Sequence, residues 1–261
     1  MSGVLISFLE DADSAHRYLA LASLNKKESL VEYSLVRPDR AIDRPRELSG
    51  LRVALSGAER IPPSDAWQRC ARDGAQIVCA TGRAVAAAGP GMAPPEQAAR
   101  ERYLRSSVAV QTEDPAIREL ARRITGNADS DEERIARILA WLDANIEKAP
   151  IDAFSALDVL KQRKAECQGH AYLYTALARA AGVPTRVVSG LVYSEQFQGF
   201  LYHSWTESLV GTRWQAVDPI FGQRAADATH IKLVEGEDLA DLMPLTESVG
   251  KLQLRVLEVE Y

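Results

Sequence analysis

A long run without proline, residues 168–181, is the feature that most constrains the fold, because it consists of helix-forming residues and ends just before Gly182-Val183-Pro184. Cys167 directly precedes this run. The sequence therefore predicts that the Cys167 thiol lies at a helix N-terminus. At such a position the backbone N–H groups and the helix macrodipole favour the thiolate form of a cysteine. We interpret Cys167 as a candidate nucleophile.

Two alternating segments, residues 202–210 and 213–217, follow the helical run and flank Gly211-Thr212. This pattern predicts a β-hairpin with His203 on its first strand and Asp218 just after its second. In an antiparallel hairpin with an even-length loop, the numbers of two opposed residues sum to an odd number, as those of His203 and Asp218 do. We therefore expect their side chains to share one face as direct or diagonal neighbours. A thiol, an imidazole and a carboxylate in this arrangement would form a catalytic triad.

The motifs around the three candidate residues also carry a resemblance. A cysteine at a helix start, the segment His203-Ser204-Trp205 and the segment Trp214-Gln215-Ala216-Val217-Asp218-Pro219 together resemble the transglutaminase-like superfamily, a branch of the papain-like cysteine enzymes. Residues 155–167, 178–193 and 228–236 look like bacterial members, and the resemblance covers residues 101–261. It implies that Cys167, His203 and Asp218 are the catalytic residues.

The chain departs from many bacterial members of this superfamily next to the candidate nucleophile. Many of them have Gly two residues before the cysteine and an acidic residue after it, whereas this chain has Ala165 and Gln168-Gly169. The departure leaves the three candidate residues intact. It bears on substrate preference.

The order of the predicted elements indicates an α+β fold. Helices are predicted at residues 115–125, 131–146 and 155–164, before the helix that begins near Cys167. A central strand is predicted at residues 186–193, and a last strand, residues 252–261, is expected to join the same sheet. The resemblance likewise implies a transglutaminase-like, papain-like core with an N-terminal active helix packed on an antiparallel sheet.

Residues 1–100 differ from the rest of the chain in their pattern of apolar and turn-forming residues. Short apolar runs at residues 30–36, 51–55 and 75–79 are bounded by Pro, Asp and Gly clusters, which predicts a small β-rich N-terminal region. The turn-rich segment 84–95 is interpreted as a boundary. We therefore predict a catalytic domain at residues 101–261.

Further side chains are candidates for substrate binding or for the oxyanion site. The backbone N–H of Cys167 is the natural first oxyanion donor, and Gln162 and Gln168 are candidates for the second. His170 lies three residues after Cys167 on nearly the same helix face. We expect it to line the pocket or to bond a neighbouring carbonyl. Trp205 is expected in the core or in the pocket wall.

A metal site is the competing interpretation of these residues. His170, Cys167, His203 and Asp218 would supply ligand types that zinc accepts. Structural zinc sites favour paired Cys or His motifs, and the sequence has no second pair of that kind. We therefore expect no metal and no cofactor.

The chemistry predicted for a Cys-His-Asp triad is acyl transfer through a thioester at a peptide or carboxamide carbonyl. Attack of water on the thioester would make the chain a cysteine protease or amidase, and attack of an amine would make it a cross-linking transglutaminase. The residues alone do not decide between them. The resemblance to bacterial members favours hydrolysis of a protein or peptide substrate. A non-catalytic peptide-binding or assembly module is the alternative from another class.

Charge and hydropathy limit the classes of partner and the locations that the sequence favours. The 261 residues carry a net charge of −5, which disfavours a nucleic-acid partner. The apolar run at residues 3–9 lacks a basic flank and is too short for a signal peptide or a membrane segment. The resemblance implies a periplasmic or other extracytoplasmic location. The composition is compatible with the cytoplasm as well, so the localisation stays open.

The sequence contains three cysteines, an odd number, so they cannot all be paired with one another. Cys70 and Cys79 flank Arg72-Asp73-Gly74, a turn signal, so they could face each other across a hairpin and oxidise. The competing interpretation is two half-buried small hydrophobic side chains. A bridge would imply an oxidising compartment. Cys167 would then be the unpaired thiol.

Overall fold

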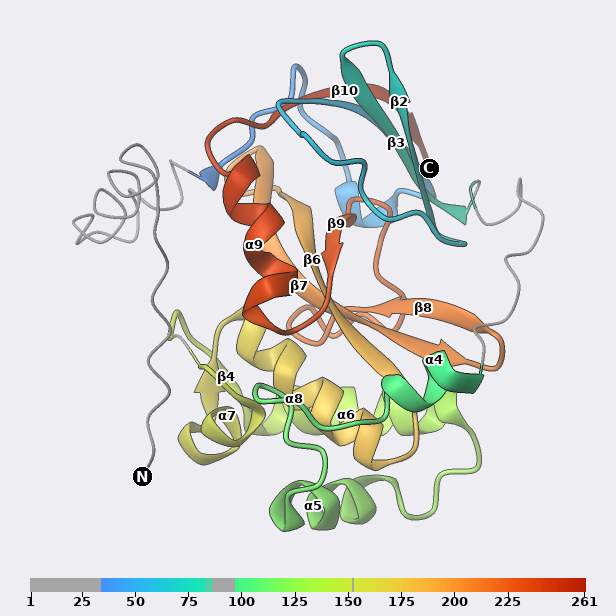
Figure 1. Ribbon diagram of the computed structural model, residues 1–261, viewed down its shortest axis with the longest axis vertical. Coiled ribbons are helices and arrows are strands. Elements are labelled where there is room, and N and C mark those ends of the chain that lie inside the picture. The colour runs from blue at the N-terminus through green and yellow to red at the C-terminus, as the bar shows by residue number, and fades with distance from the viewer. Residues whose placement is uncertain (1–33, 84, 86–96, 152) are drawn as a thin grey trace.

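The computed structural model describes residues 34–83, 85, 97–151 and 153–261. In this part of the chain, two four-stranded antiparallel sheets and a group of helices form successive layers (Figure 1). The central sheet has the strand order β8-β7-β6-β9 and lies between the helices and the second sheet. The second sheet has the order β10-β1-β3-β2. The architecture is α+β, as predicted.

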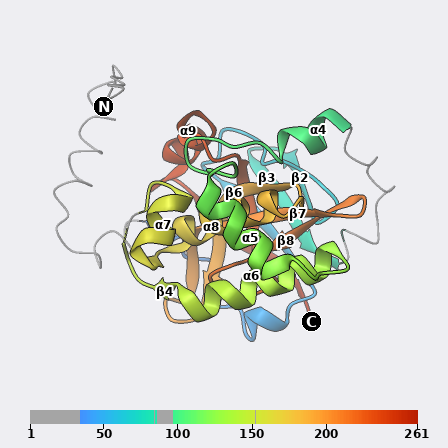
Figure 2. The ribbon, with the colours of Figure 1, turned by 90° about the horizontal axis from the view of Figure 1, so that it is seen from below.

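The helical layer surrounds one buried helix. That helix is α8 (Cys167–Ala180), and it contacts α5, α6 and α7 as well as β6 and β7 of the central sheet (Figures 1 and 2). The surrounding helices are α5 (Pro115–Thr125), α6 (Asp131–Asn145) and α7 (Ala156–Gln162). Local signals start them, because the side chains of Asp114, Ser130 and Ser155 cap their first turns. A short parallel pair, β4 (Glu147–Lys148) and β5 (Lys164–Ala165), precedes α8.

The central sheet carries the hairpin predicted from the sequence. Its strands are β6 (Thr185–Ser194), β7 (Gly199–Val210), β8 (Arg213–Val217) and β9 (Ile231–Glu235). The two central strands, β6 and β7, pair along their whole shared length. Gly190 lies where β6 meets β9, and a Cβ at this position would come within 2.0 Å of the Ile231 carbonyl oxygen. A side chain there would therefore push β9 away from the sheet.

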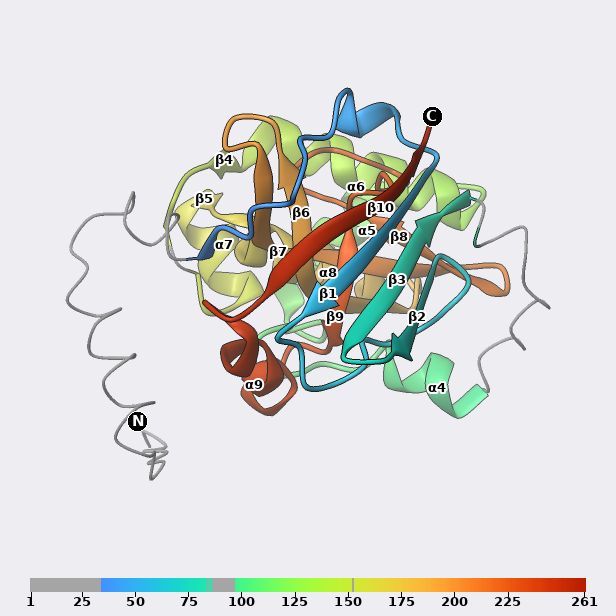
Figure 3. The same ribbon diagram turned by 90° about the horizontal axis from the view of Figure 1, so that it is seen from above.

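The second sheet is formed by β1 (Gly50–Ser56), β2 (Gln68–Asp73), β3 (Gln76–Gly82) and β10 (Gln253–Glu260). The last strand was expected in the central sheet, and the structure corrects this, because β10 pairs with β1 (Figure 3). The alternating residues Leu254 and Val256 explain the pairing, since they bury against the core that also contains Val53 and Leu55. The domain boundary near residue 100 stays a prediction, and chain from both of its sides contributes to this sheet.

Three shorter helices complete the described chain. They are the 3-10 helix η1 (Pro45–Glu47), α4 (Gln97–Arg102) and α9 (Leu239–Ser248), which packs beside β9. None of the helices in the described ranges has the length and apolar character that crossing a bilayer requires. The predicted strand 30–36 lies outside the described residues except at 34–36, where Val36 bridges to Phe200. The segment 84–95 lies outside them except for Val85.

Candidate active site

Cys167 is the first residue of α8 and is partly exposed, so its thiol lies at the helix N-terminus as predicted. The preceding residue, Glu166, caps the helix by accepting the N–H of Gln168 at 3.1 Å. The Cys167 thiol donates to Glu166 Oε2 at 3.2 Å, and it lies close enough to His203 to contribute to the raised pKa of that imidazole. A thiolate cannot donate a hydrogen bond. Forming the thiolate therefore breaks the contact with Glu166 and leaves His203 as the partner of the sulfur.

The hairpin brings His203 and Asp218 together. Thr206 of β7 pairs with Val217 of β8, so the register continued by one position sets Asp218 opposite Trp205 and diagonal to His203. The His203 Nε2 atom lies 2.7 Å from Asp218 Oδ2. The two residues are therefore diagonal neighbours on one face, as the parity of their numbers predicts. Because Nε2 is bonded to Asp218, Nδ1 is the ring nitrogen left for Cys167.

At both His203 and Asp218, charge pairing affects the pKa more strongly than burial does. Burial alone would lower the pKa of His203, but the charge and hydrogen bond of Asp218, with a further contribution from Cys167, raise this pKa to about 9. Burial alone would raise the pKa of Asp218, but the charges and hydrogen bonds of His203 and His230 hold it well below its usual range. At neutral pH His203 therefore carries both ring protons and Asp218 carries none.

Asp218 is completely buried, and both of its oxygens are hydrogen-bonded. Oδ1 accepts the backbone N–H groups of Ile220 at 2.9 Å and Phe221 at 3.0 Å. Oδ2 accepts from His203 and, at 3.0 Å, from Nε2 of His230. Four donors thus fix the orientation of this carboxylate beside the His203 ring.

His230 was not singled out by the sequence reasoning, although it contacts the same carboxylate oxygen as His203. It lies at the end of the loop that leads from β8 to β9, and its Nδ1 bonds the backbone carbonyl of Asp227 at 3.1 Å. The only sequence signal for it was its position inside residues 228–236, one of the segments that carry the family resemblance. We call Asp218, His203, His230 and Asp227 the histidine network.

Aromatic rings enclose the two imidazoles. Phe221 stacks on the His203 ring with centroids 5.1 Å apart and planes 12° from parallel, and 46% of its surface is exposed. Trp205 is buried beside both imidazoles, with its centroid 6.1 Å from that of His203 and 5.2 Å from that of His230. Trp205 is thus a core residue that borders the site, as expected, and Phe221 separates the His203 ring from solvent.

The remaining candidates differ in how they relate to Cys167. His170 is buried, and its Nδ1 donates to the Glu166 carbonyl at 2.9 Å, which is the carbonyl bond expected for it. Burial lowers the pKa of His170, so it is neutral at neutral pH. Gln162 ends α7 with an exposed side chain. Among the described residues no hydrogen bond links Gln162 to Cys167, so its oxyanion role stays a prediction.

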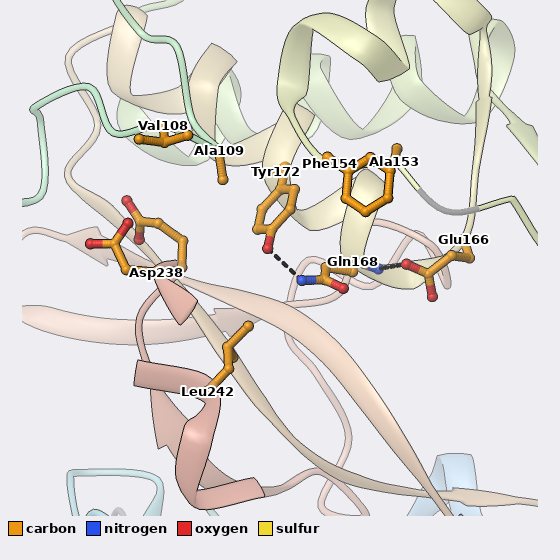
Figure 4. A pocket seen from close by; sticks show the side chains of 10 residues that line it. Val108, Ala109, Ala153, Phe154, Glu166, Gln168, Tyr172, Asp238 and Leu242 are labelled. Atoms are coloured by element: carbon orange, nitrogen blue, oxygen red, sulfur yellow. Dashed lines mark hydrogen bonds between the residues drawn. The ribbon is translucent and has the colours of Figure 1, made fainter. Parts of the chain in front are cut away.

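A cavity of about 320 Å³ borders the residues on both sides of Cys167 in the chain (Figure 4). Gln168 faces it, and the amide of this residue donates to the Tyr172 hydroxyl. The cavity wall also includes apolar and acidic side chains, namely Phe154, Leu242, Glu166, Glu237 and Asp238. The charge of Glu237 is offset by Arg179 at 2.7 Å. The cavity next to Cys167 therefore combines apolar and acidic walls.

A second cavity, of about 460 Å³, lies beside the aromatic ring that stacks on His203. Phe221, which stacks on His203, forms part of its wall together with Arg46 and Lys148. Arg46 is itself held by Asp227 at 2.8 Å and lies over the Phe221 ring at 5.0 Å. The two rims therefore differ in charge, with acidic groups near Cys167 and basic groups near His203.

A second buried polar group lies on the same sheet, and we call it the ion cluster. Its members are the two cations Arg186 and Lys232 and the three carboxylates Asp65, Glu207 and Glu235. Lys232 Nζ contacts all three carboxylates, with Glu207 at 2.9 Å and Glu235 at 2.7 Å. Arg186 bonds Glu207 and Glu235, each at 2.7 Å. Trp214 covers the Arg186 guanidinium at 4.5 Å.

Hydrogen bonds account for the atoms that could otherwise ligate a metal. His203, Asp218 and His230 place three potential ligand atoms within 4.8 Å of one another, but the two imidazole nitrogens already donate to the carboxylate oxygen between them. The three carboxylates of the ion cluster form a similar group, and the Lys232 ammonium lies among them. Neither group needs a metal ion to balance its charges.

Comparisons with known proteins point to one superfamily. Residues 118–219 match the family model of the transglutaminase-like superfamily. The chain is 30% identical to the kyphoscoliosis peptidase of Mus musculus over 144 residues, which is 49% of this chain and 22% of that protein. It is 30% identical to the kyphoscoliosis peptidase of Homo sapiens over 124 residues, 42% of this chain and 18% of that protein. The chain thus spans about a fifth of the length of these relatives.

A solved structure shares the fold. The crystal structure of a putative cysteine protease from Cytophaga hutchinsonii superposes with a TM-score of 0.51. The superposition covers 79% of this chain and 81% of that chain, at 16% sequence identity. At this identity the likeness concerns the fold alone.

Proposed function

We propose that the chain is an enzyme of the transglutaminase-like superfamily, whose family model matches residues 118–219, and that it catalyses acyl transfer at a peptide or carboxamide carbonyl. Cys167 is the nucleophile, His203 the general base and acid, and Asp218 the residue that orients His203. One observation carries the proposal. Cys167 lies at the N-terminus of α8 within reach of an imidazole whose other nitrogen is held by Asp218 at 2.7 Å.

The reaction begins with an ion pair. In this pair the Cys167 proton already resides on His203 Nδ1, which leaves the sulfur as a thiolate, and the charge of Asp218 stabilises the imidazolium. The sulfur attacks the carbonyl carbon, and the oxyanion that forms is stabilised by the Cys167 backbone N–H at the start of α8. His203 Nδ1 then donates its proton to the leaving amine as the carbon–nitrogen bond breaks. The product of this half-reaction is a thioester.

Hydrolysis of the thioester completes the proposed reaction. His203, now neutral, takes a proton from water, and the resulting hydroxide attacks the thioester carbonyl. The carbon–sulfur bond breaks, the acid leaves, and the thiolate and imidazolium are restored. The names of the relatives support hydrolysis over transfer to an amine, because two of them are peptidases and one is described as a cysteine protease.

The two cavities support a peptide substrate. His203 delivers its proton to the leaving amine, so the leaving group lies on the His203 side, where Phe221, Arg46 and Lys148 form a wall. The acyl group lies on the other side, against the cavity that Glu166 and Gln168 border. One cavity of about 320 Å³ beside the neighbours of Cys167 and another of about 460 Å³ beside the ring that stacks on His203 offer room for a peptide chain.

The disulfide supports a compartment outside the cytoplasm. Cys70 of β2 and Cys79 of β3 are directly opposed in the hairpin, are bridged, and have α-carbons 4.1 Å apart, slightly less than the usual range for disulfides. Cys167 is the free cysteine. Because cytoplasmic thiols are normally kept reduced, we place the protein in the periplasm or another oxidising compartment.

A peptide library tests the proposed reaction. Wild type and Cys167→Ala are incubated with the library, with and without an added primary amine, and the products are identified by mass spectrometry. Cleaved peptides that appear only with the wild type are expected, in similar yield with and without the amine. Amine adducts as the main product would instead establish a transferase. Peptides that bind unchanged to both proteins would establish a binding module and refute catalysis.

A further inference from the structure

His230 differs from His203 in what its second nitrogen faces. Its Nε2 lies 3.0 Å from Asp218 Oδ2, and its Nδ1 lies 3.1 Å from the backbone carbonyl oxygen of Asp227 and 3.4 Å from Asp227 Oδ1. A carbonyl and an ionised carboxylate only accept hydrogen bonds. Both nitrogens of His230 must therefore carry protons, which makes the ring an imidazolium. His203 has Asp218 on one side only, and on the other side it faces a thiol that can lose its proton.

We propose that His230 is a positioning residue of the candidate active site. In this proposal it is an imidazolium, charged at neutral pH, that holds Asp218 against His203 and sets the pH range over which Cys167 and His203 form an ion pair. The inference deepens the proposed function and rests on it. His230 touches neither the thiol nor the space where a substrate would lie, so it acts through Asp218.

The surroundings of His230 keep its charge in place. The side chain is 1% exposed, and the edges of the Trp205 and Phe221 rings face it at centroid distances of 5.2 and 6.3 Å. The charged groups that face it are Asp218, Asp227 and His203. Burial alone would lower the pKa of His230, but the two carboxylates raise it to about 9.

Charges farther from the ring are already paired. Arg46 reaches the far side of Asp227 at 2.8 Å, so it balances that carboxylate rather than His230. Lys232, two residues along the chain, is bound within the ion cluster. The carboxylate of Asp218 therefore lies between two imidazoles, and only one of them can exchange its proton with a thiol.

A fixed positive charge beyond Asp218 has the same effect on both titrations of the ion pair. It favours loss of the Cys167 proton, because a positive charge stabilises the thiolate. It also favours loss of the His203 proton, because it disfavours a second positive charge nearby and offsets part of the charge of Asp218. Removing the charge of His230 should therefore move both apparent pKa values of the ion pair upward together. A loosened core without a change in charge would not shift both apparent pKa values in the same direction.

Two substitutions separate the charge of His230 from its hydrogen bonds. In His230→Gln the amide nitrogen can replace Nε2 and keep the bond to Asp218, while the charge is lost. In His230→Asn the amide nitrogen can replace Nδ1 and keep the bond to Asp227, while the charge and the bond to Asp218 are both lost. The two variants are thus matched controls for each other.

The measurement is the rate of Cys167 alkylation by iodoacetamide between pH 4 and 10, with the unfolding temperature of each variant. Both variants should raise the two apparent pKa values of the profile by about half a pH unit or more. At pH 6 the Asn variant should react at least about tenfold more slowly than the Gln variant, the effect of losing a hydrogen bond to a charged group. Folded variants with the wild-type profile would reduce His230 to a core residue and overturn the inference.

Asp227→Asn provides a test that does not alter His230. It removes a negative charge next to the imidazolium but leaves the backbone carbonyl bond, so both apparent pKa values should move downward. An unchanged profile would overturn the inference even if the His230 variants failed to fold. If wild-type Cys167 reacts no faster than a free thiol at any pH, the proposed function fails, and this inference fails with it. If wild-type Cys167 reacts faster than a free thiol and the variants show the same pH profile as the wild type, the inference about His230 fails while the proposed function stands.

Discussion

The histidine network and the ion cluster are two buried polar groups on the same sheet, yet they are built from different chemistry. The histidine network contains two imidazoles, whose ordinary pKa lies near neutrality, and it ends at a partly exposed thiol. The ion cluster contains an ammonium, a guanidinium and three carboxylates and has no imidazole. It ends at no exposed reactive group among the described residues.

Their positions in the fold match this difference. The ion cluster joins Asp65, in the loop before β2, to strands β6, β7 and β9, so it fixes the second sheet against the central one. The histidine network joins β7 to the loop between β8 and β9. Burying charges is costly unless every charge is paired. The molecule meets this requirement in both places, but only in the histidine network can a proton move without leaving a charge unpaired.

The largest effect is expected in the histidine network. In Asp218→Asn, an amide replaces the carboxylate that fixes the protonated form and orientation of His203, so kcat should fall on the order of 10⁴-fold. The measurement is cleavage of a peptide identified in the library, with the unfolding temperature as the control for folding. A folded variant that keeps more than about a tenth of the wild-type kcat would contradict the role of Asp218.

The ion cluster should respond in stability instead. Lys232→Met leaves three carboxylates facing Arg186 alone, and breaking a buried ion pair in this way should lower the free energy of unfolding by about 3–5 kcal/mol. Urea denaturation measures the change. The matched control is Lys148→Met, which removes a half-exposed pair with Asp143 at 3.2 Å and should cost less than about 1 kcal/mol. Equal losses in the two variants would show that burial does not distinguish them.

The disulfide lies beside the ion cluster and far along the chain from the histidine network. Replacing both Cys70 and Cys79 by Ala removes a bridge across a sequence separation of 9 and should cost about 2–3 kcal/mol of unfolding free energy. The activity at saturating substrate should stay at the wild-type level. Thiol counting under denaturing, non-reducing conditions should find one free thiol in the wild type. A count of three would remove both this prediction and the argument for an oxidising compartment.

The smallest effect is a dependence of stability on pH that arises in the histidine network. The pKa values of His203 and His230 are raised from 6.5 to about 9. Their contribution to stability is therefore fully present below about pH 6.5 and is lost as the pH rises towards 9. Urea denaturation at several pH values should show this decline in the wild type and a weaker decline in His230→Gln. Parallel declines in both proteins would assign the dependence to other groups.

Low pH acts on the same network in the opposite sense. The pKa of Asp218 is lowered in the folded state, so its contribution is present above the ordinary pKa of an aspartate and is lost as the pH falls below it. The network therefore stabilises the fold most between these two limits.

Local periodicity determined the parts of the site that lie close together in sequence. A helical run directly after Cys167 is enough to set the thiol at the start of α8. The two-residue alternation of the strands is enough to bring His203 and Asp218 to one face. The opposition of Cys70 and Cys79 follows in the same way from a turn signal between two short strands. These features depend on the geometry of one element or one hairpin, which neighbouring residues fix.

Only the tertiary structure decided the contacts made across irregular segments. His230 reaches Asp218 because the loop between β8 and β9 folds back on itself, and no repeat in the sequence encodes that path. The sequence around Lys232 predicts an ordinary strand residue. Only the structure shows that Lys232 contacts Asp65, which lies 167 residues away in the chain. The strand β10 alternates in a way that fits either sheet, and the apolar face next to β1 selects its partner. The sequence specifies which faces are apolar, and packing decides which of them meet.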